Sequence, residues 1–519
     1  MSAARSTGKR RVLLIGLDSA DAELIDAWMR EGYMPNFARL RGDGRWSRVG
    51  TTAEIMHVSA WPTLYTGTTP GHHGLYHAYQ VRAGHQTIGR AEPSLSGQPP
   101  FWKHLDDAGR RCIVLDAFMD HRLPNFRGIQ VLEYGTWTWF GEPGSTPPRA
   151  LAGIKRRFGP YPAPEHTDQV RVPDDPRRFR DLLVAGARVK GRVVQAFMKE
   201  QEWDLLFATF GEPHGAGHYL WHLGDPDYPR RPDSALTGVH AIRDVYAAVD
   251  EAIGAIVDTA DDRTTVMIVS GDGMGPNYSG CHMMPELLHK MGLFHGENVG
   301  RDPATKRAPK KGVLSQLRQL VPLGFRESVS RCLPLNVRHR MSLKWMNTGT
   351  DWSRSRVFCI PNSNEAYLRV NLRGREPLGI VASGDECAEL LGGLRETLEA
   401  LKNPANGRRA AERVTLMDEV FAGARRADLP DATISWREDA RVSNALEAPA
   451  IGTVTGSAPA YGISPFYTGN HKPNAFVLER GAGIAAGSSL ERGHILDVAP
   501  TILTLLGVDV PRHYEGTPR

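Results

Sequence analysis

The most constraining feature of the sequence is a pattern that occurs four times: a short apolar run that leads into a polar turn. The runs span residues 12–17, 111–115, 204–209 and 264–269. Their length and their polar or turn-forming boundaries are typical of buried strands. Helical patterns separate them, and the longest, residues 235–259, repeats apolar residues near the 3.6-residue helical period. We therefore predict an α/β fold with a mostly parallel central sheet and helices on both faces.

Residues that can bind ligands stand directly after these predicted strands. Asp18 follows the first run and Asp116 follows the second. His214 and Asp272 follow the third and the fourth. Because open α/β sheets bind their ligands at the carboxyl ends of the strands, we expect Asp18, His214 and Asp272 to lie at one sheet edge.

Two clusters within these turns suggest metal chemistry. Glu-Pro-His-Gly-Ala-Gly-His at residues 212–218 places His214 and His218 four residues apart, so that both imidazoles can converge on one cation. A pair of loop histidines without a metal fits the spacing equally well. Ser-Gly-Asp-Gly at residues 270–273 sets a carboxylate between glycines that allow a close approach. Taken alone, this second cluster also fits a tight turn capped by its aspartate.

The overall composition narrows the class of protein. A net charge of +5 over 519 residues does not indicate a nucleic-acid partner. The five cysteines are scattered without a CxxC pair, which suits a reducing compartment. No apolar run reaches membrane length, and the run at residues 12–17 is too short for a signal peptide. We therefore predict a cytoplasmic protein without a membrane span.

The strand–helix rhythm breaks at residues 295–352. We interpret this stretch as a cap or surface insertion between two parts of one core, at residues 10–294 and 353–519. Residues 301–344 hold eleven Lys or Arg against two acids. Such a segment is either a solvated surface or a rim that attracts an anionic substrate.

Motifs spread over nearly the whole chain carry a resemblance to a known family. The motifs are GLDSAD at 16–21, GYMPNFARL at 32–40, TGTTPGHHG at 66–74, NLRGREPLGIV at 371–381, TGNH at 468–471 and DVAPTIL at 497–503. In this order, they resemble the motifs of the alkaline phosphatase superfamily, in its branch of type I phosphodiesterase/nucleotide pyrophosphatase-like predicted phosphohydrolases and phosphomutases. The resemblance implies an alkaline-phosphatase-like core with a cap-like insertion.

The resemblance also implies two adjacent metal sites. The first would comprise His214, His218 and His471, and the second would comprise Asp18 and Asp272. Two divalent ions are expected, zinc first, with manganese, magnesium or calcium as alternatives. Such a pair can clamp a tetrahedral phosphoryl or sulfuryl centre, one ion activating the nucleophile and the other stabilising the leaving oxygen.

The chain departs from the family pattern in three places. His214 stands where the family has an aspartate. Gly271-Asp272 stand where the family has an Asp-His pair, so one ligand of the second site is missing. The nucleophilic Thr, Ser or modified Cys of the family lies nine residues before Thr66, and that position is His57.

Four interpretations of His57 follow. It is a further ligand of the second site, with a metal-bound hydroxide as nucleophile, or it is itself the covalent nucleophile. Alternatively, the turn is remodelled and Ser59, two residues later, attacks. The fourth interpretation is a buried histidine satisfied by backbone. We favour the first, in which His57 completes the second site with Asp18 and Asp272.

These inferences predict a metal-dependent hydrolase that acts on small anionic phosphate esters, with phosphodiesters favoured over phosphomonoesters. A sulfatase or phosphonate hydrolase of the same superfamily is one alternative. Another is a non-hydrolytic, phosphomutase-like or catalytically altered metal-binding member. A nucleic-acid-binding module that uses residues 301–344 is a third, and it predicts strongly salt-dependent affinity.

Overall fold

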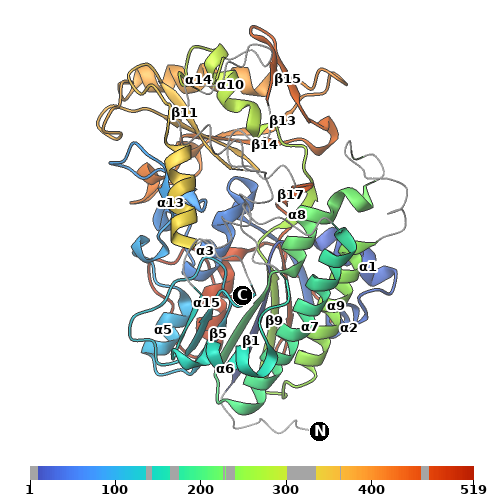
Figure 1. Cartoon of the computed structure of the whole chain (residues 1–519). Helices are drawn as coiled ribbons and strands as arrows, with labels where there is room; N and C mark the ends of the chain where they lie inside the picture. The colour runs from blue at the N-terminus through green and yellow to red at the C-terminus, as the bar shows by residue number, and fades with distance from the viewer. Residues whose placement is uncertain are drawn as a thin grey trace.

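The structure is a computed structural model of the whole chain (Figure 1). It describes residues 10–135, 143–163, 175–225, 228, 240–297, 299–300, 335–362, 364–456 and 467–519.

The described residues form a nine-stranded main sheet in the order β19-β2-β18-β9-β1-β8-β5-β6-β7. The central strands β9, β1, β8, β5 and β6 run parallel, while β18 and β7 pair antiparallel with their neighbours. The predicted mostly parallel α/β sheet is therefore confirmed. The strands are β1 (Arg11–Leu17), β2 (Arg45–Gly50), β5 (Cys112–Leu115), β6 (Ile129–Leu132), β7 (Gly144–Thr146), β8 (Leu205–Phe210), β9 (Thr264–Ser270), β18 (Phe476–Arg480) and β19 (Gly493–His494).

Helices cover both faces of this sheet. Successive strand residues point to opposite sides, and the strands carry apolar residues on both sides. In β1, Val12 and Leu14 join one hydrophobic cluster, and Leu13 and Ile15 join the other. The first cluster includes α3 (Ala60–Thr66), α5 (Phe101–Asp107) and α15 (Val498–Leu505). The second includes α1 (Ala22–Arg30), α2 (Pro35–Asp43), α7 (Pro176–Glu200) and α9 (Ala241–Val257), with α7 and α9 packed side by side (Figure 1).

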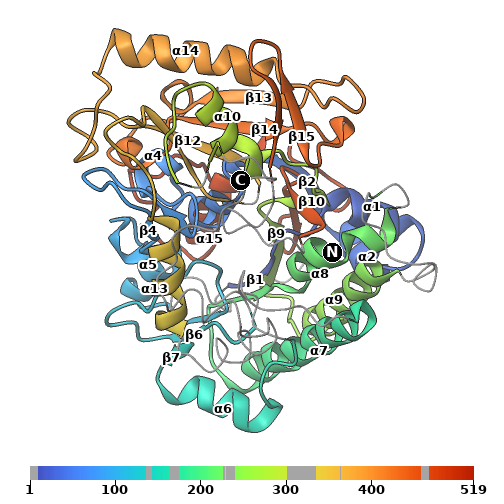
Figure 2. The same cartoon turned by 45° about the horizontal axis from the view of Figure 1, so that its top comes forward.

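A second, antiparallel sheet lies above the main one (Figures 1 and 2). Its strand order is β11-β12-β14-β13. A hydrophobic cluster joins this sheet to α10 (Met284–Lys290) and α14 (Asp385–Glu399). The strands are β11 (Val357–Ile360), β12 (Ala366–Val370), β13 (Ala411–Leu416) and β14 (Ala432–Trp436).

The strand–helix pattern of the sequence did not reveal this second sheet. The expected division into residues 10–294, 295–352 and 353–519 stays a prediction. Residues 301–334, which hold most of the basic segment, lie outside the described residues. Within the rest of that segment, α13 (Leu335–Met346) is helical. Among the described residues, no helix combines the length and the apolar character needed to cross a membrane.

Candidate active site

The carboxyl ends of three neighbouring strands bring the predicted site residues together. Strand β1 lies between β8 and β9 in parallel register, so the three strands end at one level. Asp18 follows β1 directly, and Asp272 lies two residues after the end of β9. His214 lies in the first turn of α8 (Glu212–Gly224), which begins just after β8. The structure therefore places Asp18, His214 and Asp272 at one edge of the sheet.

Helix α8 presents two imidazoles one helical turn apart. The ring centroids of His214 and His218 are 4.6 Å apart. Nδ1 of His218 lies 2.9 Å from the carbonyl oxygen of Gly469. Because a carbonyl oxygen can only accept, Nδ1 carries the proton, and the lone pair of the ring is on Nε2.

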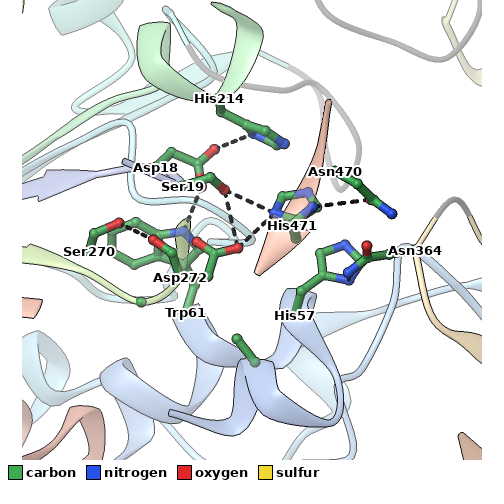
Figure 3. Close-up of polar contacts among 12 residues, drawn as sticks. Asp18, Ser19, His57, Trp61, His214, Ser270, Asp272, Asn364, Asn470 and His471 are labelled. Carbon is green, nitrogen blue, oxygen red and sulfur yellow. Dashed lines mark hydrogen bonds and ion pairs between the residues drawn. The ribbon is translucent and has the colours of Figure 1, made fainter. Parts of the chain in front are cut away.

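The third imidazole, His471, comes from β17 (Gly469–Lys472), more than 250 residues later in the chain. Strand β17 pairs with β10 (Gly273–Pro276), which follows Asp272. Its approach to α8 depends on Gly469, where a Cβ would lie 2.1 Å from the carbonyl oxygen of Gly217. Nδ1 of His471 lies 2.7 Å from Oδ2 of Asp272 (Figure 3).

The three rings surround one point. The centroid of His471 is 4.9 Å from that of His214 and 4.8 Å from that of His218. One ligand atom from each of the three residues lies within 4.8 Å of the others. Burial, together with the charges of His57 and His218, lowers the pKa of His471 well below its usual value. A lowered pKa favours the neutral imidazole, which is the form that binds metals.

Asp18 orients the imidazole ring of His214. Oδ2 of Asp18 accepts from Nδ1 of His214 at 2.7 Å, and Oδ1 accepts from Nε1 of Trp61 at 2.8 Å (Figure 3). A carboxylate on the non-ligating nitrogen is the usual partner of a metal-binding histidine. The contact fixes the His214 tautomer that leaves Nε2 able to bind a cation.

Ser19 was missed by the sequence analysis, although it joins two site residues. Its Oγ lies 3.2 Å from both Oδ2 of Asp272 and Nδ1 of His471. Its backbone is left-handed, with φ at +52°, a conformation that non-glycine residues seldom adopt. Such strain clusters at functional sites, but it leaves no pattern in the sequence.

The donor set fits a divalent cation. Three imidazoles form a familiar zinc ligand set, and two buried carboxylates lie beside them. Burial and the charge of Asp18 raise the pKa of Asp272 well above its usual value. A cation beside this pair would relieve that cost, since a positive charge favours the ionised form.

The second predicted site, formed by Asp18, His57 and Asp272, stays a prediction. Within the part of the chain that the structure describes, the group at ligand spacing is His214, His218 and His471. The departure at Gly271 has a packing reason, because a Cβ there would lie 2.9 Å from the Cβ of Ala60. A side-chain ligand at this position would displace the start of α3.

His57 lies at the start of the short 3-10 turn η2 (His57–Ser59) and faces the cluster. Its ring stacks on His471 with centroids 4.0 Å apart and planes inclined by 21°. Its Nδ1 lies 2.8 Å from Oε2 of Glu365. Burial alone would raise the pKa of Glu365, but the charge of His57 and its hydrogen bonds hold that pKa below its usual value.

Glu365 was also not predicted from the sequence. It lies in the loop before β12, outside the motifs that carry the resemblance. Ser59, the rival nucleophile, turns inward instead. Its fully buried Oγ lies 2.6 Å from the carbonyl oxygen of Met56 and 2.8 Å from Oγ1 of Thr52. These contacts are those of a side chain that stabilises its own turn.

A buried charge network supports the first turn of α8. Nζ of Lys190, on α7, lies 3.0 Å from Oδ2 of Asp116 and donates to the carbonyl oxygen of Thr209 at 2.8 Å. Glu212 accepts from the hydroxyl of Tyr161 at 2.5 Å. Asp116, the fourth strand-end residue, therefore belongs to this support rather than to the histidine cluster.

A cavity of about 460 Å³ opens between the histidine cluster and the second sheet. Its lining includes His471, Glu365 and Trp436. Three basic residues, Arg413, Arg437 and Lys472, line it together with six acidic ones. The cavity gives a small molecule access to one edge of the site.

Comparison with known proteins gives the same family as the motifs. Residues 12–446 match the type I phosphodiesterase / nucleotide pyrophosphatase family. The chain belongs to this family. It is therefore a hydrolase of the alkaline phosphatase superfamily that acts on phosphoester bonds. The match ends before His471, the third residue of the histidine cluster.

A solved structure with a TM-score above 0.5 shares the fold at low sequence identity. Phosphonoacetate hydrolase from Sinorhizobium meliloti 1021, in complex with phosphonoformate, is 12% identical, with a TM-score of 0.55 and 96% of each chain covered. Human ectonucleotide pyrophosphatase / phosphodiesterase 5 is 13% identical, with a TM-score of 0.45, 98% of this chain covered and 97% of that one. A comparison with curated proteins gives no match.

Proposed function

We propose that the chain is a metal-dependent phosphodiesterase whose divalent cation is held by His214, His218 and His471. The observation that supports this proposal is the convergence of three buried imidazoles on one point beside a cavity. Zinc suits this all-nitrogen set better than the oxygen-preferring magnesium or calcium. Manganese stays an alternative.

The bound cation would act as a Lewis acid toward a phosphoryl oxygen. The protein residues have separate tasks. Asp18 and the carbonyl of Gly469 hold the tautomers of His214 and His218. Ser19 bridges Asp272 and His471, so the edge of the site is fixed before substrate arrives. Such preorganisation is what electrostatic stabilisation of a transition state requires.

We propose a small anionic ester as the substrate. Lys472 and Arg413 in the cavity wall can balance its charge, although each already pairs with an acid, Lys472 with Glu23 and Arg413 with Glu54. The indole of Trp436 offers a flat apolar surface for an organic substituent on phosphorus. A diester carries two such substituents and one negative charge, which suits this mixed wall.

The scattered free cysteines support a cytoplasmic location.

The first test measures metal content and turnover together. Purified chain loaded with zinc or manganese would be assayed with bis(4-nitrophenyl) phosphate, 4-nitrophenyl phosphate, 4-nitrophenyl sulfate and phosphonoacetate. We expect the diester to be the best of the four. A faster reaction with the sulfate or the phosphonate would replace the diesterase proposal with one of the other superfamily activities.

Variants at the cluster test the ligand assignment. His214→Ala and His471→Ala should each lose bound metal, measured by elemental analysis. The matched control is His85→Ala, which removes an exposed histidine outside the cluster. If both cluster variants retain full metal content, the assignment is wrong.

A further inference from the structure

We infer that Glu365 is a positioning residue that holds His57 for attack on phosphorus, so that hydrolysis passes through a phosphoryl group carried on Nε2 of His57. This inference rests on the proposed function, and it specifies the nucleophile of the same site.

Glu365 contacts His57 at two positions, the backbone N–H and the imidazole ring. Its Oε1 accepts from the backbone N–H of His57 at 3.0 Å, and its Oε2 lies 2.8 Å from Nδ1 of the ring. Two other donors complete the shell. Nδ2 of Asn364 donates to Oε1 and the hydroxyl of Tyr367 donates to Oε2, both at 3.1 Å. With a further contact of 3.1 Å between Nδ1 of His57 and Oε1, five contacts on two oxygens fix the orientation of the carboxylate.

These contacts determine which imidazole nitrogen of His57 can act as the nucleophile. Glu365 is a buried carboxylate, 4% exposed, and an ionised carboxylate can only accept hydrogen bonds. In the neutral form of the His57 ring, which is the nucleophilic form, the proton therefore lies on Nδ1 and the lone pair lies on Nε2. When Nε2 becomes bonded to phosphorus, the ring gains positive charge, and Glu365 lies within hydrogen-bond distance to stabilise it.

The ring is also in the right place. It stacks on His471, and Glu365 and His471 line the same cavity. A phosphoryl group bound at the histidine cluster would therefore be adjacent to His57. Ser59 is directed away from this space by its bonds to Met56 and Thr52. By position in the sequence, His57 also occupies the place of the family's nucleophile.

The two chemical steps balance with one water molecule. In the first step, the Nε2 lone pair forms an N–P bond while the bond from phosphorus to the leaving oxygen breaks. The electron pair stays on that oxygen, which takes a proton from water. In the second step, the resulting hydroxide attacks phosphorus, the N–P bond breaks and its electron pair returns to Nε2. The products are an alcohol and a phosphomonoester.

Stereochemistry distinguishes this route from direct attack by water. Each displacement inverts phosphorus, so two displacements give net retention and a single displacement gives inversion. The assay follows a diester that is chiral at phosphorus through the wild-type protein in isotopically labelled water. We expect retention, with an adduct on His57 that survives alkali and is lost in acid, as phosphoramidates are. Inversion would overturn the inference.

The role of Glu365 has its own readouts. We expect Glu365→Gln to keep its bound metal but to lose roughly 10²- to 10⁴-fold in kcat, as when a carboxylate that sets an imidazole tautomer becomes an amide. Glu365→Asp should recover part of that loss. Glu479→Gln, which removes a buried carboxylate on β18, is the matched control.

A spectroscopic signal does not depend on turnover. In histidine-labelled protein, the Nδ1–H of His57 should give a downfield proton resonance that disappears in Glu365→Gln and in His57→Asn. If this resonance and kcat are unchanged in Glu365→Gln, Glu365 does not position His57.

The outcomes separate this inference from the proposed function. Turnover with inversion would overturn the His57 route and leave the phosphodiesterase proposal intact. An adduct on His57 without turnover would overturn the phosphodiesterase proposal and support His57 as the phosphoryl carrier. Loss of metal in His57→Asn would make His57 a ligand and overturn the inference. The absence of both adduct and turnover would overturn both proposals.

Discussion

Replacing Asp18 by asparagine tests how the site sets the tautomer of His214. Two N–H donors meet the two oxygens of Asp18: Nδ1 of His214 at 2.7 Å and Nε1 of Trp61 at 2.8 Å. An asparagine offers only one acceptor oxygen to these two donors. If that oxygen faces Trp61, the amide N–H₂ faces His214, and the ring proton must move to Nε2. That nitrogen can then no longer bind the cation.

The expected magnitude follows from this mismatch. Loss of a hydrogen bond to a metal-binding histidine weakens metal affinity by about 10- to 100-fold. This range corresponds to roughly 1.4–2.8 kcal/mol of binding free energy. In the metal-free protein, the unmatched buried donor should also lower the free energy of unfolding by about 1–3 kcal/mol.

Competition with a chromophoric chelator gives the dissociation constant for zinc, and urea unfolding gives the stability of the metal-free form. The informative control is the double variant Asp18→Asn, Trp61→Phe. Without the indole donor, the amide oxygen can turn to His214, so most of the lost metal affinity should return. Asp26→Asn serves as an unrelated control, because Asp26 pairs with Arg41 and Arg48 instead.

Two results would refute this reasoning. Wild-type zinc affinity in Asp18→Asn would show that the carboxylate does not set the tautomer. Equal weakness of the single and double variants would show that Asp18 binds the cation directly, as the predicted second site requires.

Three further predictions follow from buried and strained groups. Ser19→Ala keeps the left-handed backbone but loses the contacts to Asp272 and His471, so its unfolding free energy should fall by about 1–2 kcal/mol. Ser19→Gly loses the same contacts but relieves the backbone strain, so it should be more stable than Ser19→Ala. Equal urea midpoints for the two variants would contradict the strain argument. Lys190→Met leaves the Asp116 carboxylate without its buried cation and should cost about 3–5 kcal/mol of unfolding free energy. Burial raises the pKa of Glu212, and the charge of Lys190 opposes that rise. Without Lys190, the folded protein should bind a proton at Glu212 more readily, so the loss of unfolding free energy should shrink as the pH of the assay falls. A loss that does not change with pH would argue against the charge network. Burial lowers the pKa of His73 from 6.5 to about 3, so the unfolded state takes up the proton first and stability should fall as the pH drops below 6.5. His73→Gln should flatten this dependence, and an unchanged slope would exclude His73 as its source.

The sequence predicted those parts of the site that lie at the ends of regular strands. Asp18, His214 and Asp272 could be placed at one edge because apolar runs mark the strands and parallel strands end together. His471 could be predicted only from the resemblance, because it lies in a short strand without an apolar run. The pairing of β17 with β10 brings it to the site, and no local pattern encodes that pairing.

Other features have no local signature at all. Glu365 is an acid in a loop, and only the tertiary fold places it against His57. Ser19 differs from any other serine only by its backbone conformation. The second sheet was missed because its strands are short and antiparallel, with α14 and long connections between them. Strand–helix alternation predicts parallel sheets and gives little information about such pairings.

The pairing of β17 with β10 has a consequence for how the protein is made. A chain that has emerged from the ribosome only as far as β16 (Gly452–Thr455) would hold His214 and His218 but not His471. Because domains begin to fold during synthesis, a largely formed core would precede the third ligand. If the proposed ligand set is right, fragments truncated before Gly469 would stay metal-poor. Tight metal binding would then begin only once β17 has been made and paired with β10.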